Sequence, residues 1–264
     1  MLTTEQRHEL ADLLHAAETK REPIPPLVDT YPGLDAGDAY EIQLVNIHRR
    51  VSDAPIVGHK VGLSSKAMQQ MMGVDEPDYG HLLEDMRVGE GTPVPAARYC
   101  YPRVEVEVGF VLGADLPGEG CTEQDVIAAT EAVVPSIELI DSRIRDWKIS
   151  LPDTIADNAS SAGFVLGEAR LAPDTVDLRA IDAVLVRNGE QVAEGRSDAV
   201  LGDPVIAVAW LARKVAGFGV RLRAGHVILP GSCTRAFDAR PGDEFTATFS
   251  HAGGVLGDVS LTFQ

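Results

Sequence analysis

Basic residues are scarce in this sequence. Its 264 residues include 40 Asp and Glu but only 23 Lys and Arg, which gives a formal net charge of -17. Nucleic acids and anionic membranes are bound by basic surfaces that replace their counterions, so the charge argues against both as partners. A binding site for an anion would need local positive charge of its own, such as a bound cation or a buried lysine.

Cysteines and long apolar runs are also lacking. Cys100, Cys121 and Cys233 are far apart and show no zinc-type spacing, which predicts reduced structural thiols rather than a disulfide framework. No apolar run approaches the roughly 20 residues that cross a bilayer, and the N-terminus has no basic-then-apolar signal pattern. We therefore expect a cytoplasmic protein. Its 45% hydrophobic content is enough for a sizeable core.

The first 50 residues have the periodicity of helices. Leu10, Leu14 and Ala17 recur at helical spacing after a capping box formed by Thr3 and Gln6. A second helix is predicted over residues 37–50, and a proline-rich link separates the two. The pattern predicts a small helical N-terminal unit over residues 1–55.

From residue 56 the pattern changes to short strands. Strands are predicted over 56–63, 102–113 and 135–141, with a helix over 122–134, a hairpin at Asn188-Gly189, a helix from Asp203 and three late strands. The strands do not alternate with long helices, which disfavours a doubly wound sheet. We predict an α+β fold, in which residues 56–264 form a mixed, mainly antiparallel β domain with peripheral helices.

Three glutamates stand out in the strands. Glu105 and Glu107 lie on one face of the strand over 102–113, where Cβ atoms two residues apart are roughly 7 Å from each other. Glu138 lies inside an apolar strand, where an unpaired charge is costly. One hard cation such as Mg²⁺ or Mn²⁺ would account for all three, although two glutamates at this spacing are also common on a solvated strand face.

Lys60 and Asp78 are candidate catalytic residues. Lys60 lies in a strand between Gly58 and Gly62, and a half-buried lysine there could orient a substrate carboxylate, transfer a proton, or simply reach to the surface. Asp78 follows a predicted helix and lies in a turn-forming context. It could be a general acid/base or only a residue of the turn. His59 points away from Lys60 in a strand, so we interpret it as structural or solvent-facing rather than as a ligand.

Several separated segments occur in the order known from one family. They are GHKVGLSSKAMQQMMGVDEPDYGHLLEDM, PRVEVEVGFVL, VVPSIELIDSRIRDWKI, DTIADNASSAGFVLG, GDPVIAVAWLARK and RPGDEF. From about residue 25 onward the chain resembles the 2-hydroxypenta-2,4-dienoate (2-oxopent-4-enoate) hydratases, in the hydratase and decarboxylase branch of the fumarylacetoacetate hydrolase superfamily. The resemblance implies a β-roll catalytic domain, a Mg²⁺ or Mn²⁺ site and a homo-oligomer.

The resemblance also implies an activity and a set of site residues. The expected reaction adds water to a 2-hydroxydienoate, through its 2-oxo tautomer, to give a 4-hydroxy-2-oxo acid in aromatic or steroid ring catabolism. The implied residues are Glu105, Glu107 and Glu138 for the metal, Lys60 and Asp78 for catalysis, and Ser160 and Ser161 near the substrate.

One segment departs from the pentadienoate hydratase pattern. Residues 229–243 read LPGSCTRAFDARPGD, which is nearer the heptenedioate hydratases. Arg235 could bind the distal carboxylate of a 2-oxohept-3-ene-1,7-dioate, or could be a surface or subunit-contact residue. A 4-oxalocrotonate-type decarboxylase is a further alternative. The RIRDWK segment favours a hydratase over this decarboxylase, by resemblance. The alternative outside enzymes is a non-catalytic subunit of a degradative complex.

Overall fold

Helices form the N-terminal part of the protein, whose computed structural model describes all 264 residues. They are α1 (Thr4–Lys20), α2 (Leu27–Thr30) and α3 (Ala36–Arg50). Thr3 caps α1 as predicted: its hydroxyl accepts a hydrogen bond from the Gln6 backbone N–H at 3.2 Å, and the Gln6 side chain accepts one from the Thr3 N–H at 2.8 Å. Asp35 caps α3 in the same way, by accepting a hydrogen bond from the Asp38 N–H at 2.9 Å.

A seven-stranded sheet is the centre of the fold. Its strands are β1 (Ile56–Gly62), β2 (Asp78–Leu83), β3 (Arg103–Leu112), β4 (Thr130–Ile140), β5 (Ser161–Leu166), β8 (Val227–Leu229) and β9 (Phe237–Asp238). The order is β2-β1-β8-β3-β4-β5, and β9 pairs with β3. Only the pairing of β1 with β8 is parallel. Because β8 is three residues long, it separates β1 from β3 over only part of their length.

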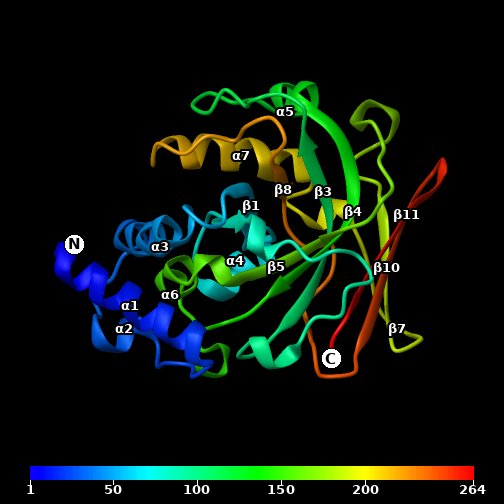
Figure 1. Cartoon of the computed structure of the whole chain (residues 1–264). Coiled ribbons are helices and arrows are strands. Elements are labelled where there is room, and N and C mark those ends of the chain that lie inside the picture. Colours follow the sequence, from blue (N-terminus) through cyan, green and yellow to red (C-terminus); the bar gives the residue numbers. More distant parts are fainter.

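A second, four-stranded sheet packs against β4 through β10 and β11 (Figure 1). It contains β6 (Asp182–Arg187), β7 (Glu190–Arg196), β10 (Glu244–His251) and β11 (Gly254–Thr262), in the order β11-β10-β6-β7. Asn188 and Gly189 join β6 to β7 with φ values of 53° and 82°, which confirms the predicted hairpin turn.

The remaining helices lie around the sheets (Figure 1). They are α4 (Lys66–Met72), α5 (Glu123–Ala129), α6 (Leu151–Ala156) and α7 (Pro204–Ala216). Single 3₁₀ turns occupy Glu84–Met86, Ala96–Arg98, Arg145–Trp147, Asn158–Ser160, Pro173–Thr175 and Ser197–Ala199. The predicted α+β fold with a mainly antiparallel sheet and peripheral helices is therefore confirmed.

Two local predictions were wrong. The helix predicted over 122–134 ends at Ala129, because the β-branched residues that follow it, such as Val133 and Val134, pair with β3 as the start of β4. Asp78 does not lie in a turn but is the first residue of β2, opposite Gly62. Every residue of β2 is buried, so the strand shows no alternation that the sequence could reveal.

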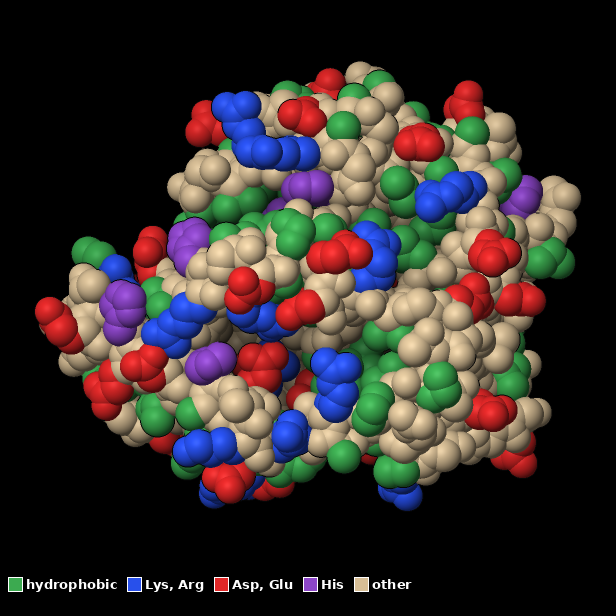
Figure 2. Space-filling model, in the orientation of Figure 1, with side chains coloured by type: hydrophobic (Ala, Val, Ile, Leu, Met, Phe, Trp, Pro, Cys, Tyr) green, Lys and Arg blue, Asp and Glu red, His purple; other side chains and the backbone are tan.

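The N-terminal helices share the core of the sheets. One cluster of 51 buried residues contains Leu10 of α1 and Tyr40 of α3 together with Val104 of β3 and Phe245 of β10. The division of the chain at residue 55 therefore stays a prediction. None of the helices has the length and apolar character that crossing a membrane requires. Figure 2 shows acidic side chains spread among basic ones over one face.

Candidate metal centre and active site

Three glutamate carboxylates converge on the strand pair β3 and β4. Glu105 lies directly opposite Glu138 in the antiparallel register, and Glu107 lies two residues further along β3, opposite Ser136. One oxygen from each glutamate can be chosen so that all three lie within 4.8 Å of one another. Glu107 and Glu138 are fully buried, and Glu105 is partly exposed. The predicted cluster is thus assembled.

Hydrogen bonds hold two of these carboxylates while leaving oxygens free. Glu138 Oε1 accepts a hydrogen bond from the Ser161 hydroxyl at 2.9 Å, and Glu107 Oε2 accepts one from the Gly231 backbone N–H at 2.7 Å. Glu107 Oε1 and Glu138 Oε2 are buried and make no hydrogen bond. A buried carboxylate oxygen without a donor is costly. Hard oxygen ligands with unused lone pairs fit a divalent cation such as Mg²⁺ or Mn²⁺.

Burial raises the pKa of each of the three carboxyl groups. It raises the pKa of Glu138 to about 7, against the opposing effect of the Lys60 charge. Burial, and then the negative charges of Glu138 and Glu105, raise the pKa of Glu107 well above its usual range. The pKa of Glu105 is raised by burial and lowered in part by Lys60. A divalent cation would relieve both the repulsion and the desolvation.

Lys60 lies beside the carboxylates with its side chain buried. Its ammonium is 3.5 Å from Glu138 Oε2 and donates a hydrogen bond to the backbone carbonyl of Ala159 at 2.9 Å. Burial lowers the pKa of Lys60, but Glu138, Glu105 and the other nearby carboxylates raise it by more, so the net shift is upward. Lys60 therefore stays charged, as a single ammonium among the carboxylates.

A left-handed turn presents the acceptor for Lys60. Asn158, Ala159 and Ser160 have φ values of 55°, 49° and 59°, a conformation that is unfavourable for most residues other than glycine and asparagine. The Asn158 side chain fixes the turn on β2, because its Oδ1 accepts from the His81 N–H at 2.8 Å and its Nδ2 donates to the His81 carbonyl at 3.0 Å. Such strain persists where the surrounding structure determines the backbone.

Asp78 approaches Lys60 across the pair β1 and β2. It lies opposite Gly62, and a Cβ atom at Gly62 would clash with Asp78 Oδ1. The glycine therefore permits the approach of Asp78. Asp78 is buried, and its Oδ1 makes no hydrogen bond. Burial raises the pKa of Asp78, and the charge of Lys60 opposes the rise.

A cavity of about 850 Å³ opens beside these groups. Lys60, Asp78 and Glu105 line one part of it. The methionines of α4 line another part, namely Met68, Met71 and Met72. The volume lies within the usual range for small-molecule sites, and the combination of an apolar lining with few charged groups is typical of them.

The predicted substrate-binding residues take different positions. Ser160 is buried and lines the cavity, 3.4 Å from the Thr154 hydroxyl. Ser161 does not line the cavity, because its hydroxyl is directed to Glu138. Arg235 lines the cavity from an exposed position, with its guanidinium carbon 4.3 Å from the centre of the Phe237 ring.

His59 lies outside this constellation. It is fully buried, and its ring lies 4.8 Å from that of His81. The predicted structural role agrees with this placement, whereas the solvent-facing alternative does not.

Comparison with known proteins agrees with the fold. The model of the fumarylacetoacetate (FAA) hydrolase C-terminal family matches residues 57–260. The chain belongs to the fumarylacetoacetate hydrolase family. Members similar to it include a 2-keto-4-pentenoate hydratase of Paraburkholderia xenovorans, 44% identical over 96% of this chain and 95% of the relative. A 2-oxo-hept-4-ene-1,7-dioate hydratase of Escherichia coli is 42% identical over 93% of this chain and 95% of the relative.

A solved structure of the same family is closely similar. The 4-oxalocrotonate decarboxylase from Pseudomonas putida G7, complexed with magnesium and adipate, superposes with a TM-score of 0.94 at 38% identity. The match covers 100% of this chain and 99% of the decarboxylase. The resemblance inferred from the sequence segments is thereby confirmed at the level of the family.

Three contributors to the site were missed by the sequence reasoning. The Gly231 N–H and the Ala159 carbonyl are backbone groups, for which side-chain motifs give no signal. The third is the buried pair of Arg143 and Asp157, in which the arginine donates to the Asp157 carbonyl at 2.6 Å as well as to its carboxylate. This pair fixes the residue that precedes the left-handed turn. An arginine in the run Ser142-Arg143-Ile144 is the only hint the sequence offers.

Proposed function

We propose that this protein is a metal-dependent hydratase that converts a 2-hydroxydienoate, such as 2-hydroxypenta-2,4-dienoate, into a 4-hydroxy-2-oxo acid. The observation that carries the proposal is the group of three glutamates beside a buried, charged lysine, with Glu105 and Lys60 in the wall of one cavity. The 44% identity to a 2-keto-4-pentenoate hydratase over nearly the whole chain supports it. The expected setting is the catabolism of aromatic or steroid rings.

Glu105, Glu107 and Glu138 would hold Mg²⁺ or Mn²⁺ through their free oxygens. When bound, such a cation supplies positive charge that stabilises the oxyanion of a 2-oxo acid enolate. Ser161 would keep Glu138 oriented through its 2.9 Å hydrogen bond, and the Gly231 N–H would do the same for Glu107.

Lys60 would stabilise developing charge on the substrate, and Asp78 would transfer protons. The dienol loses the proton of its C2 hydroxyl and gains one at C5, which gives a 2-oxo acid with a double bond between C3 and C4. The Lys60 ammonium would stabilise the negative charge that develops on the C2 oxygen. The oxygen of water then bonds to C4, and Asp78 would accept the proton that this water loses and return it to C3. The raised pKa of Asp78 suits a group that both accepts and donates a proton.

Ser160 and Arg235 would contact the substrate from the cavity wall. Ser160 is buried and lines the same cavity as Lys60 and Glu105, so its hydroxyl would bind the reacting end of a substrate there. Arg235 makes no ion pair with a protein carboxylate, so its guanidinium is free to meet a distal negative group.

The test is the loss of dienol absorbance on mixing the purified protein with 2-hydroxypenta-2,4-dienoate and Mg²⁺ or Mn²⁺. We expect turnover that stops with a chelator and returns with added metal. Glu107→Gln should be inactive, and the exposed Glu168→Gln, which also removes one carboxylate, should retain activity. Full activity of Glu107→Gln in chelated buffer would refute the proposal.

A decarboxylase is the second candidate, favoured by the TM-score of 0.94 to the 4-oxalocrotonate decarboxylase. The same site could stabilise the carbanion that remains when CO₂ leaves a 2-oxo acid. A heptenedioate hydratase is the third, favoured by Arg235 and by the 42% identical relative from Escherichia coli. Measuring CO₂ release from a 2-hydroxymuconate-type substrate, and comparing turnover of the five-carbon and seven-carbon dienoates, separates the three activities.

We further propose that the protein is a cytoplasmic homo-oligomer, as the family resemblance implies. Light scattering of the purified protein gives the subunit number directly, and a monomer at assay concentration would contradict this proposal.

A further inference from the structure

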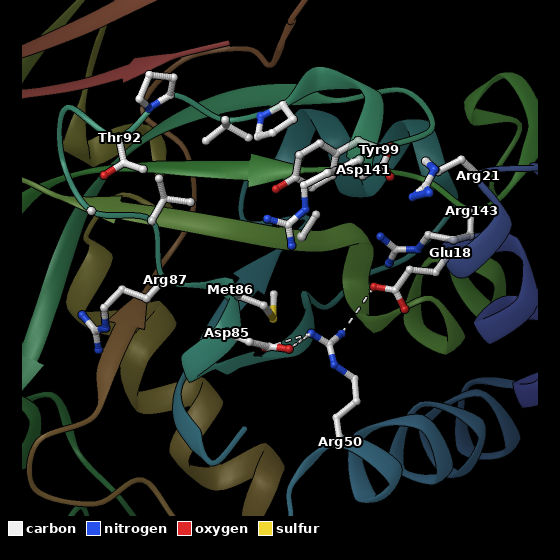
Figure 3. A pocket seen from close by; sticks show the side chains of 17 residues that line it. Glu18, Arg21, Arg50, Asp85, Met86, Arg87, Thr92, Tyr99, Asp141 and Arg143 are labelled. Atoms are coloured by element: carbon white, nitrogen blue, oxygen red, sulfur yellow. Dashed lines mark hydrogen bonds and ion pairs between the residues drawn. The ribbon is translucent and has the colours of Figure 1, made fainter. Parts of the chain in front are cut away.

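A second cavity, of about 340 Å³ (Figure 3), shares no lining residue with the cavity of the proposed active site. Glu18, Arg21 and Arg50 of the N-terminal helical region line one side. The segment that links β2 to β3 lines another side, and Asp141 and Arg143, which follow β4, complete the wall. The cavity thus lies where the N-terminal helices meet the sheet.

The lining of this cavity is rich in arginine. Five arginines and three carboxylates line it, in a chain whose net charge is -17, and two of the arginines pair with carboxylates outside the lining, Arg143 with Asp157 and Arg87 with Glu84. The five are Arg21, Arg50, Arg87, Arg98 and Arg143, and the three are Glu18, Asp85 and Asp141. Guanidinium groups bind carboxylates and phosphates through paired hydrogen bonds. Guanidinium groups without an ion pair oppose the repulsion of anions by the rest of the surface.

The carboxylates of the cavity are already engaged. Asp85 receives two hydrogen bonds of 2.9 Å from Arg50, whose other terminal nitrogen lies 3.4 Å from Glu18. Asp141 accepts hydrogen bonds from the backbone N–H groups of Cys100 and Tyr101 at 2.9 and 2.6 Å. These acidic groups neutralise Arg50 and fix a loop, and none of them pairs with Arg21 or Arg98.

Two of those arginines make no ion pair at all. Arg21 ends α1 in a left-handed conformation and is exposed, and Arg98 is exposed at the end of its 3₁₀ turn. Arg87 has only a 3.4 Å contact with Glu84, and its guanidinium carbon lies 4.9 Å from the centre of the Phe164 ring. Figure 3 shows Arg87, Arg50 and Arg21 on different sides of the cavity, so that a molecule inside would be approached by guanidinium groups from several directions.

We propose that this cavity binds a small oxyanion carrying at least two negative charges, either a phosphate ester or a dicarboxylate. The two free guanidinium groups match two negative charges, and Arg87 can add a third contact. The volume is at the lower end of the range of small-molecule sites, which suits a metabolite and excludes a peptide. The apolar floor, which includes Met86 and Val94, would exclude water from one side of the ligand.

The test is isothermal titration calorimetry of the full-length protein at constant ionic strength, with inorganic phosphate and succinate as separate probes. The decisive variant is the double substitution Arg21→Gln and Arg98→Gln. The matched control is Arg221→Gln with Arg223→Gln, which removes two exposed arginines that make no ion pair and line neither cavity. We expect wild type and control to bind with equal affinity, and the decisive variant to bind at least about tenfold more weakly.

Binding of either probe with this pattern supports the proposal, and the probe that binds more tightly identifies the phosphate or the carboxylate source. Glu107→Gln should bind the probe as wild type does, because the proposed metal centre takes no part. Absence of binding by wild type, equal binding by the decisive variant, or loss of binding in Glu107→Gln would overturn it. A smaller oligomer of the decisive variant in size-exclusion chromatography would also overturn it, because the cavity would then be a contact between copies of the chain.

Discussion

The buried glutamates should make the stability of the metal-free protein fall as the pH rises. The pKa of Glu138 is about 7 in the folded protein against an ordinary value of 4.5, so the folded state binds this proton more tightly than the unfolded state does. Stability gained from that proton is fully present below about pH 4.5 and is lost as the pH rises through about 7. A shift of this size corresponds to roughly 3 kcal/mol. Glu107 and Glu105 have pKa values shifted in the same direction and add to the effect.

A cation removes this loss, because it binds the deprotonated carboxylates. Magnesium should therefore raise the unfolding temperature more at about pH 8 than at about pH 5.5. For a chain of this size, about 3 kcal/mol corresponds to roughly 5 to 10 °C. The assay is differential scanning calorimetry of chelated and Mg²⁺-saturated protein at both pH values.

Glu138→Gln is the matched control, since it keeps the shape and the Ser161 hydrogen bond but removes the charge. Without metal at about pH 8, this variant should be more stable than wild type, by up to about 3 kcal/mol, while Mg²⁺ should stabilise it little. Lys60 keeps Glu105, Glu107 and Asp78 as nearby charges in the variant. An equal magnesium effect at both pH values, or a variant less stable than wild type, would refute the reasoning.

Three further substitutions test the site. Lys60→Met should lower kcat by roughly 10²- to 10⁴-fold in the dienol assay with unchanged circular dichroism, and a loss of only a few fold would argue against its role. Gly62→Ala should lower the free energy of unfolding by about 1–3 kcal/mol in chemical denaturation and should lower kcat, because the new methyl group displaces Asp78. Wild-type activity of this variant would show that the position of Asp78 next to Gly62 is unimportant for catalysis. Ser161→Ala should weaken metal affinity by about 10- to 100-fold in a calorimetric titration, because Glu138 loses the hydrogen bond from the Ser161 hydroxyl. An unchanged metal affinity would exclude an orienting role for Ser161.

The site glutamates could be predicted because strands have a period of two. Alternation along β3 places Glu105 and Glu107 on one face, and an apolar environment singles out Glu138. That Glu105 lies opposite Glu138 depends on the register between β3 and β4, which are separated by residues 113–129, and no local pattern specifies this register. The resemblance to the hydratases supplied what periodicity could not, namely the prediction that the three glutamates and Lys60 belong to one site.

Other parts could not be predicted because their causes are not local. The end of α5 at Ala129 is decided by pairing of the next residues with β3, which overrides a continuing helical pattern. The strand β2 is buried on both faces and so lacks alternation. The segment Asn158–Ser160 contains no glycine, yet all three residues have left-handed backbone conformations. The Asn158 side chain is hydrogen-bonded to β2 on one side of the turn, and Arg143 is hydrogen-bonded to Asp157 on the other.

The left-handed turn has a consequence for how this family can vary. The hydrogen-bond acceptor for the Lys60 ammonium is the backbone carbonyl of Ala159, so a residue of any type at position 159 carries this oxygen. What must be preserved is a dihedral angle, which glycine or asparagine can adopt easily and valine, isoleucine or proline cannot. Side-chain identity at this position is therefore a poor guide to its importance, and replacements there should be ranked by their backbone preference rather than by their size or polarity.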